Sequence, residues 1–279
     1  MQPPAHGHDI ARRMHQLVEP IHLVTYLSAE PTAALVALGM RNYWDGYFAG
    51  RAAPLGVVPA EVVDAAFYNF ADGEVARHIP RVWTITTPEA ALAARQEGSV
   101  AALRRILGDL ADSPGLASAA DLATTAATSA PVEGRVLYAA LRGLPVPDEP
   151  VARLWHAATL LREHRGDGHV AAVVTEDIGG TEAHMLHALS LGIPAVSFGR
   201  VHHLPAERLA EVLDGLRDRG LVDACGWFTD AGRKTKERIE SLTDDLAAPA
   251  YASLDADELE RLVADLDPIS AVLEAAGSR

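Results

Sequence analysis

The sequence predicts a mainly α-helical protein, and two observations support this fold class. Hydrophobic residues make up 49% of the chain but aromatic residues only 5%, so the apolar positions are rich in Ala, Leu and Val, a composition that favours helix. Proline and capping residues also divide the chain into segments of helical length, with Pro59 and Pro88 placed where a first helical turn tolerates proline. Short β-wings are the expected exception.

The N-terminal and central segments are expected to be helical in order. Asp9 can cap the first helix, and Pro20 and Pro31 mark helix starts or breaks. Breaks are expected near residues 113–115 and 144–147, the second being a short stiff connector. The helical segments themselves are expected at residues 9–40, 59–70, 73–83, 97–163 and 181–191, with a turn and a short element at 166–174 and an irregular insertion at 193–205.

Residues 209–240 carry the clearest local pattern. Leu209, Val212, Leu213 and Leu216 keep the spacing of a buried helical stripe, and Gly220 stands where a helix end needs positive φ. Residues 221–222 and 227–228 then flank a short turn, and a helix capped by Thr229 is expected from Asp230. The order helix, β-wing, helix resembles that of a winged-helix module.

A weak internal duplication suggests two such modules in tandem. The segments 51–56 and 165–169 each follow a helix and precede another. The resulting fold prediction is two winged-helix-like halves with short β-wings. Residues 1–96 form the N-terminal half, 97–147 a helical connector, and 148–279 the second half with C-terminal helices.

The segments 47–56, 67–70, 75–83, 161–169 and 229–233 together resemble a group of actinobacterial helix-turn-helix proteins related to the MarR-like regulators. The resemblance implies a winged-helix scaffold over nearly the full length. It also implies that the acidic helical tail at 239–276 forms a dimer or inter-domain interface, so a homodimer or hetero-oligomer is expected. The stretch 192–207 departs from the pattern of the group.

Charge and composition narrow the function classes. A net charge of −14 and a pI near 5.2 are unfavourable for binding nucleic acid, because non-specific affinity for phosphates depends on a basic face. No apolar run of 18 residues and no signal layout at the N-terminus are present, so a cytoplasmic location is expected. The single Cys225 excludes an internal disulfide.

The helix expected at residues 180–189 would read DNA in a helix-turn-helix protein. It offers one glutamate and two histidines but no Arg, Lys, Asn or Gln for phosphates or base edges. Arg233, Lys234, Lys236 and Arg238 follow the wing, although this run equally suits a solvated helix face. DNA binding is therefore possible but disfavoured.

The cluster at residues 162–169 is the first candidate site. Arg165 can bind a carboxylate or phosphate through two hydrogen bonds, and His169 and Asp167 are candidate proton-handling groups. Glycines on both sides of Asp167 would let the backbone turn close to a ligand. The alternative is a polar helix end in which an Arg–Asp pair fixes a turn.

The aromatic stretches are the second candidate site. Arg51, Arg77 and Asn69 lie among aromatic residues that include Tyr47 and Tyr68, and a pocket of apolar walls with a few polar groups is typical of small-molecule sites. Most of these aromatic residues could equally be core. If the halves face each other, the arginines could converge with Arg165 and His169 on an anionic group.

No cofactor or metal is expected. The sequence has no HExxH motif, paired-cysteine spacing, GxSxG motif or phosphate-binding loop, and the histidines at 184, 187, 202 and 203 do not form a recognised ligand set.

The sequence therefore favours a small-molecule-binding protein. The first hypothesis is a cofactor-free enzyme of actinobacterial specialised metabolism that performs a cyclisation, elimination or group displacement on a polar anionic substrate between the halves. The second is a ligand-responsive MarR-like transcription regulator that binds DNA. The third is a non-catalytic partner subunit.

Overall fold

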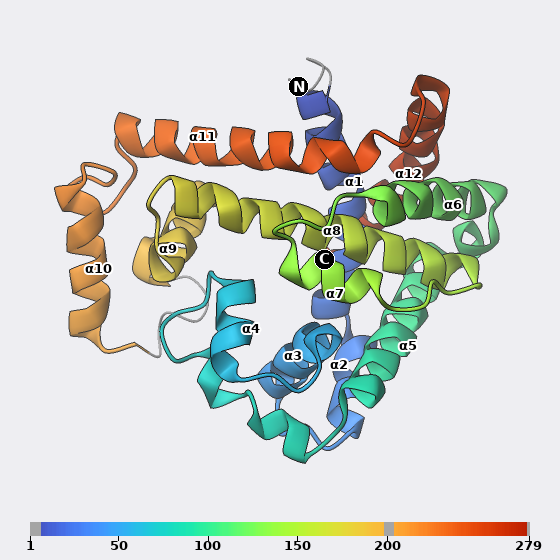
Figure 1. Ribbon diagram of the computed structural model, residues 1–279, viewed down its shortest axis with the longest axis horizontal. Helices are drawn as coiled ribbons and strands as arrows, with labels where there is room; N and C mark the ends of the chain where they lie inside the picture. The colour runs from blue at the N-terminus through green and yellow to red at the C-terminus, as the bar shows by residue number, and fades with distance from the viewer. Residues whose placement is uncertain (1–6, 198–203, 278–279) are drawn as a thin grey trace.

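A computed structural model describes residues 7–197 and 204–277, and every regular element in these ranges is a helix (Figure 1). The α-helices are α1 (Gly7–Leu27), α2 (Ala29–Ala37), α3 (Tyr43–Ala52), α4 (Ala60–Phe67), α5 (Pro88–Leu107), α6 (Pro114–Ser129), α7 (Val136–Arg142), α8 (Pro150–Thr175), α9 (Gly180–Ser190), α10 (Ala206–Asp218), α11 (Asp230–Ala247) and α12 (Ala256–Gly277). Short 3-10 turns connect several of them, including η1 (Ala53–Leu55), η2 (Val75–Arg77) and η3 (Arg81–Thr84). The mainly α-helical class is confirmed.

The larger of two hydrophobic cores is built from α1 to α7, the first half of α8 and α12. Alanine lines much of α6, where positions 119, 120, 123, 126 and 127 are all buried, so α6 and α8 can pack closely. The apolar face of α12, with Leu262, Leu266 and Ile269, is buried against α1 and α6 of the same chain.

The smaller core lies at the other end of α8. It contains Ile178, Met185 of α9, Leu216 of α10 and Ile239 of α11, and it is separate from the larger core. The stripe predicted on α10 packs here, with Leu216 fully buried and Leu209, Val212 and Leu213 partly buried against it. Figure 1 shows α10 at the opposite end of the molecule from α5 and α6, with α8 and α11 running between the two cores.

The turn predicted at residues 166–174 is absent, because α8 runs without interruption from Pro150 to Thr175. A Cβ on Gly168 would lie 2.2 Å from Nη1 of Arg135, so this glycine makes room for the Arg135 side chain rather than forming a turn. The glycines in this segment had suggested a loop, whereas tertiary packing explains at least one of them.

The predicted β-wings are wrong, since the described ranges contain no strand or sheet. Residues 221–228 contain one isolated antiparallel bridge, between Val222 and Phe228. The side chain of Asp223 accepts hydrogen bonds from the backbone N–H groups of Cys225 and Trp227, which closes a tight turn between the two bridged residues. Thr229 then caps α11, as predicted, by accepting a hydrogen bond from Gly232 N at 3.0 Å. The segment therefore turns into helix before a second residue pair can form.

The other local predictions around α10 hold. Gly220 has a φ of +68°, the left-handed conformation that ends α10. Part of the predicted insertion at 193–205 lies outside the described residues. Across the described ranges, none of the helices combines the length and apolar character required to cross a membrane.

Candidate functional site

Five of the eight predicted site residues line one cavity of about 80 Å³. It lies between the α3–α4 region and the face that α8 and α9 turn toward it. The predicted residues on its wall are Arg51, Tyr68, Asn69, Asp167 and His169, and their neighbours include Phe67, Arg162, Glu163, Val173 and Ala183. Helical spacing on α8 explains the shared wall, because residues 162, 166, 169 and 173 recur at intervals of three or four.

The centre of the cavity wall is a buried ion pair between Arg51 of α3 and Glu163 of α8. Nε and Nη2 of Arg51 donate to the two oxygens of Glu163 at 3.4 and 3.2 Å, and the two residues are only 8% and 1% exposed. Burial favours the neutral forms, but Arg162 and Arg51 hold the pKa of Glu163 well below its usual value. The same carboxylate raises the pKa of Arg51 above its usual value. Arg51 therefore already has a carboxylate partner.

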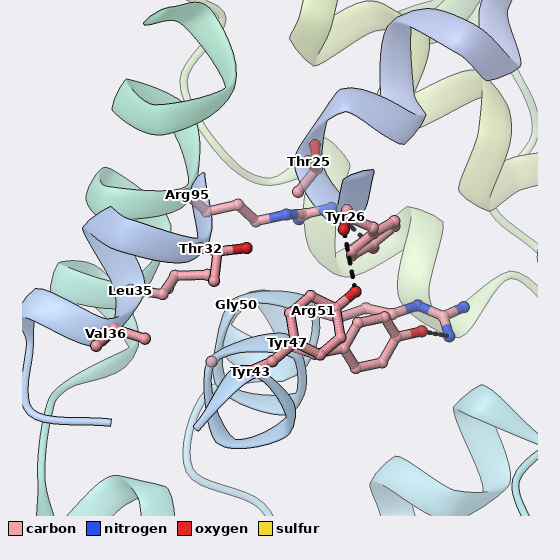
Figure 2. A pocket seen from close by; sticks show the side chains of 11 residues that line it. Thr25, Tyr26, Thr32, Leu35, Val36, Tyr43, Tyr47, Gly50, Arg51 and Arg95 are labelled. Atoms are coloured by element: carbon pink, nitrogen blue, oxygen red, sulfur yellow. Dashed lines mark hydrogen bonds between the residues drawn. The ribbon is translucent and has the colours of Figure 1, made fainter. Parts of the chain in front are cut away.

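Two further contacts fix the Arg51 side chain, and one more fixes its partner Glu163. Nη1 donates to the hydroxyl of Tyr47 at 3.2 Å, one of the hydrogen bonds drawn in Figure 2, and the guanidinium lies 4.1 Å from the centre of the Phe67 ring. Arg162 supplies a third N–H to Glu163 at 2.9 Å. Tyr47, predicted to bind substrate, thus orients Arg51 in this structure.

Asp167 bonds away from His169, toward α7. Its Oδ2 accepts a hydrogen bond from the backbone N–H of Tyr138 at 2.9 Å and so satisfies a free donor in the first turn of that helix. Burial raises the pKa of Asp167 to about 6, against the opposing hydrogen bond from Tyr138. A carboxyl group with this pKa can exchange a proton near neutral pH.

His169 bonds toward α11. Its Nδ1 lies 3.0 Å from Oγ1 of Thr243, whose own proton goes to the Ile239 carbonyl oxygen at 2.7 Å. This network makes Nδ1 the donor, and Nε2 is then the acceptor nitrogen of a neutral ring. Burial lowers the pKa of His169 to about 4, so the ring is neutral at pH 7. The predicted pair therefore consists of two groups on one cavity whose hydrogen bonds go to different helices.

Tyr68 links the cavity to α9. Its φ is +56°, a conformation rare for a tyrosine, and its hydroxyl donates to the Ile178 carbonyl oxygen at 2.6 Å. A Cβ on Gly180 would lie 2.2 Å from the Tyr68 carbonyl oxygen. The first residue of α9 therefore packs directly on the backbone of the cavity wall.

Arg165 and Arg77 do not line this cavity. Arg165 donates to Glu240 and Asp244 of α11 at 3.1 and 3.0 Å, on a different cleft, and the side chain of Arg77 is 61% exposed near Glu74. Because residue 165 is part of a helix, it points away from the side occupied by 163 and 167. The structure therefore does not bring Arg51, Arg77 and Arg165 together around one anion, as the sequence analysis predicted.

Sequence reasoning passed over Glu163, the residue that organises the site. Its position on the same helical side as Leu160 and Asp167 was the available signal, because a carboxylate on a buried stripe needs a cationic partner. Among the described residues, no three His, Cys, Asp or Glu side chains are arranged to share a metal ion.

The surface beyond the cavity is formed by α10. Leu216 is its one fully buried residue, whereas α9 buries residues 181, 185, 186, 188 and 189. Arg208, Arg217 and Arg219 each contact an acidic side chain at the surface, at 2.7 to 3.2 Å. Such exposed pairs contribute little to stability and can be exchanged for other anions.

Comparison with known proteins identifies the family. Neither the curated proteins nor the solved structures contain a match to this chain. The profile of the helix-turn-helix family matches residues 11–278, which is nearly the whole chain. The chain therefore belongs to the helix-turn-helix family.

Proposed function

We propose that this protein is a ligand-responsive transcription regulator of the MarR-like kind, with α10 as its DNA-facing helix. The observation that carries the proposal is the arrangement of the smaller core, in which α9 is buried and the following helix, α10, is exposed. In a helix-turn-helix unit the second helix enters the major groove, so α10 takes the DNA-facing role that the sequence suggested for residues 180–189, the helix that is buried here as α9. The family match supports the same assignment.

The charge distribution is compatible with this surface. Residues 204–240 contain seven basic and eight acidic residues, a net charge of −1, whereas the whole chain carries −14. Both lysines of the protein are in this segment, and Lys234 is exposed in the first turns of α11. Trp227, 40% exposed at the preceding turn, adds an aromatic group next to the basic residues.

The cavity on α8 is suited to control that surface. Ala183 of α9 lines it, and the contacts of Tyr68 with Ile178 and Gly180 join its wall to the start of α9. A ligand that separates α4 from α8 would therefore shift α9, and with it α10. A ligand changes DNA affinity only by as much as its affinity differs between the two arrangements.

Binding of labelled genomic fragments, followed by fluorescence anisotropy, tests the proposal. Arg217→Ala combined with Lys234→Ala should weaken binding at least tenfold. Arg104→Ala, which removes an exposed arginine of α5, should leave binding unchanged. Equal loss in both variants, or no binding by the wild-type protein, would contradict the proposal.

A second candidate, the cofactor-free enzyme, is favoured by one observation. Asp167 with a pKa of about 6 and a neutral His169 share the wall of one cavity, as an acid and a base can. Turnover of an anionic substrate that is lost in His169→Ala, while the variant keeps its fold, would support this enzyme. The DNA-binding test separates the two functions.

A further inference from the structure

Arg95 of α5 is the feature that neither the fold nor the proposed function explains. It is 1% exposed, and its side chain is the largest of those that are fully buried among the described residues. Figure 2 shows it reaching from α5 toward Tyr26 of α1. Nη2 donates to the Tyr26 hydroxyl at a long 3.4 Å, and Nε has no hydrogen-bond partner.

Other buried arginines of the described residues are compensated. Arg51 binds the carboxylate of Glu163, and Arg135 donates to the carbonyl oxygens of His164 and Leu246 at 2.8 and 2.7 Å. Within the described ranges, Arg95 has no carboxylate inside 4.0 Å; its guanidinium lies 5.4 Å from the centre of the Trp155 ring. Burying a cation without an anion is costly, so the structure leaves a counter-charge missing at this point.

The missing counter-charge coincides with a cleft of about 310 Å³ that Arg95 lines. The cleft lies between α5, the proline-rich connector at residues 144–147 and α8, and it shares no lining residue with the cavity of about 80 Å³ described above. Its walls are mostly apolar, and its apolar lining residues are Leu92, Ala93, Leu141, Leu144, Pro145, Val146, Pro147 and Trp155. The volume falls at the lower end of the range for small-molecule sites.

A second unsatisfied polar group lies on the same cleft. His156 is 5% exposed, and its Nε2 has no hydrogen-bond partner. Burial, followed by the charge of Arg95, lowers the pKa of His156 to about 4, so the ring is neutral and can donate or accept one hydrogen bond. Both unsatisfied groups are thus buried at a cleft whose other polar lining residues are Gln96 and Thr159 and whose remaining lining is apolar.

We propose that this cleft binds a small organic carboxylate with an apolar aliphatic or aromatic body. The carboxylate pairs with the guanidinium of Arg95, whose Nε has no partner and can form, with an Nη, the planar fork that matches a carboxylate. Because Arg95 is only 1% exposed, binding requires its side chain to turn from Tyr26 toward the cleft. Nε2 of His156 contributes a further hydrogen bond, and the apolar body packs on Trp155 and the connector. This site does not depend on DNA binding.

Calorimetric titration with octanoate and phenylacetate, each compared with its primary amide, tests the inference. The wild-type protein should bind at least one carboxylate and bind the matching amide at least tenfold more weakly. Arg95→Met should lose the preference for the carboxylate, and Arg105→Met, an exposed arginine on the same helix, should keep it.

Two further results discriminate a ligand site from a structural arginine. Arg95→Met should unfold at the same or a higher temperature than the wild-type protein, because it removes an uncompensated buried charge. Ala93→Trp, which fills the cleft from an exposed position, should abolish binding with Arg95 intact. Failure of the wild-type protein to bind either carboxylate, or unchanged carboxylate preference in Arg95→Met, would overturn the inference.

Discussion

At the scale of single residues, the Arg51–Glu163 pair is the clearest constraint on the site. Glu163 accepts hydrogen bonds from two arginines in a fully buried position. Removing its charge leaves Arg51 and Arg162 without a buried partner, so Glu163→Gln should lower the free energy of unfolding by about 3–5 kcal/mol in urea titration.

The matched control is an exposed pair. Glu30→Gln removes the partner of Arg105 at the surface and should cost less than about 1 kcal/mol. Similar losses in the two variants would show that the Arg51–Glu163 pair is no more important than a surface contact.

Asp167 gives a prediction with a defined pH range. Its pKa is about 6 in the folded protein against 3.8 for an ordinary aspartate, so the folded state binds more protons between these values. Its contribution to stability is therefore present below about pH 4 and is lost as the pH rises through 6. Asp167→Asn keeps an oxygen for the Tyr138 N–H but cannot ionise, and should be more stable than wild type at pH 7.5 by about 1–3 kcal/mol.

Asp167→Ala is the control for the hydrogen bond. It removes the acceptor as well as the charge and should be less stable than Asp167→Asn at every pH measured by thermal unfolding. If Asp167→Asn were the less stable of the two, the α7 hydrogen bond would not be the structural role of this residue.

At the scale of elements, the packing around the glycines of α8 provides the main test of the fold. Alanine normally stabilises a helix relative to glycine by about 0.5–1 kcal/mol. At Gly168, a Cβ would lie 2.2 Å from the Arg135 guanidinium, which is held by the carbonyl oxygens of His164 and Leu246, so Gly168→Ala should instead destabilise the protein by about 1–3 kcal/mol. Gly166→Ala, whose Cβ would meet its nearest neighbour, Glu163, at 3.4 Å, should change stability by less than about 1 kcal/mol. Equal effects at the two positions would show that Gly168 is not needed to make room for Arg135.

The same helix shows how far sequence reasoning reached. The apolar stripe of α10, the Thr229 cap and the glycine end at residue 220 are local signals, and the structure has all three. Glycines 166 and 168 produce the same sequence pattern whether they make a turn or admit a neighbouring side chain, and only Arg135, more than 30 positions away, distinguishes the cases. The β-wing failed for a related reason, because residues 221–228 contain strand-forming side chains but too few backbone pairs.

The candidate site could be predicted from the sequence to the same degree. Residue type and helical spacing identified Arg51, Asp167 and His169, which share a cavity. The partners that determine their chemistry, Glu163, Tyr138 and Thr243, come from contacts over long sequence distances or from an overlooked neighbour in the motif. Arg95 lies on the buried stripe of α5 with Ala91, Gly98 and Ala102, and a charged residue in that position was a signal that could have been read.

At the scale of the whole molecule, buried histidines should make the protein sensitive to acid. Burial lowers the pKa of His156, His164 and His169 to about 4, against 6.5 for an ordinary histidine. The unfolded chain then binds more protons between these values, so stability is lost as the pH falls from about 6.5 to 4. Each histidine can contribute about 3 kcal/mol, and together they outweigh the opposite effect of Asp167.

Urea unfolding measured at several pH values checks this balance. The free energy of unfolding should fall by several kcal/mol between pH 6.5 and 4.5, and His156→Gln should reduce the slope. A free energy of unfolding that stays constant or increases as the pH falls over this range would show that the histidines are accessible to protons in the folded state.

The larger question for the molecule is whether α10 binds DNA and whether a ligand in the cavity on α8 controls that binding. The most direct measurement is a titration of the protein against its own upstream region and pooled genomic fragments at low and near-physiological salt. The account predicts binding that prefers one fragment and weakens on the order of 100-fold between about 50 and 200 mM salt, as about four phosphate contacts require. Absence of binding even at low salt would contradict the regulator and leave the enzyme hypothesis for the Asp167–His169 cavity.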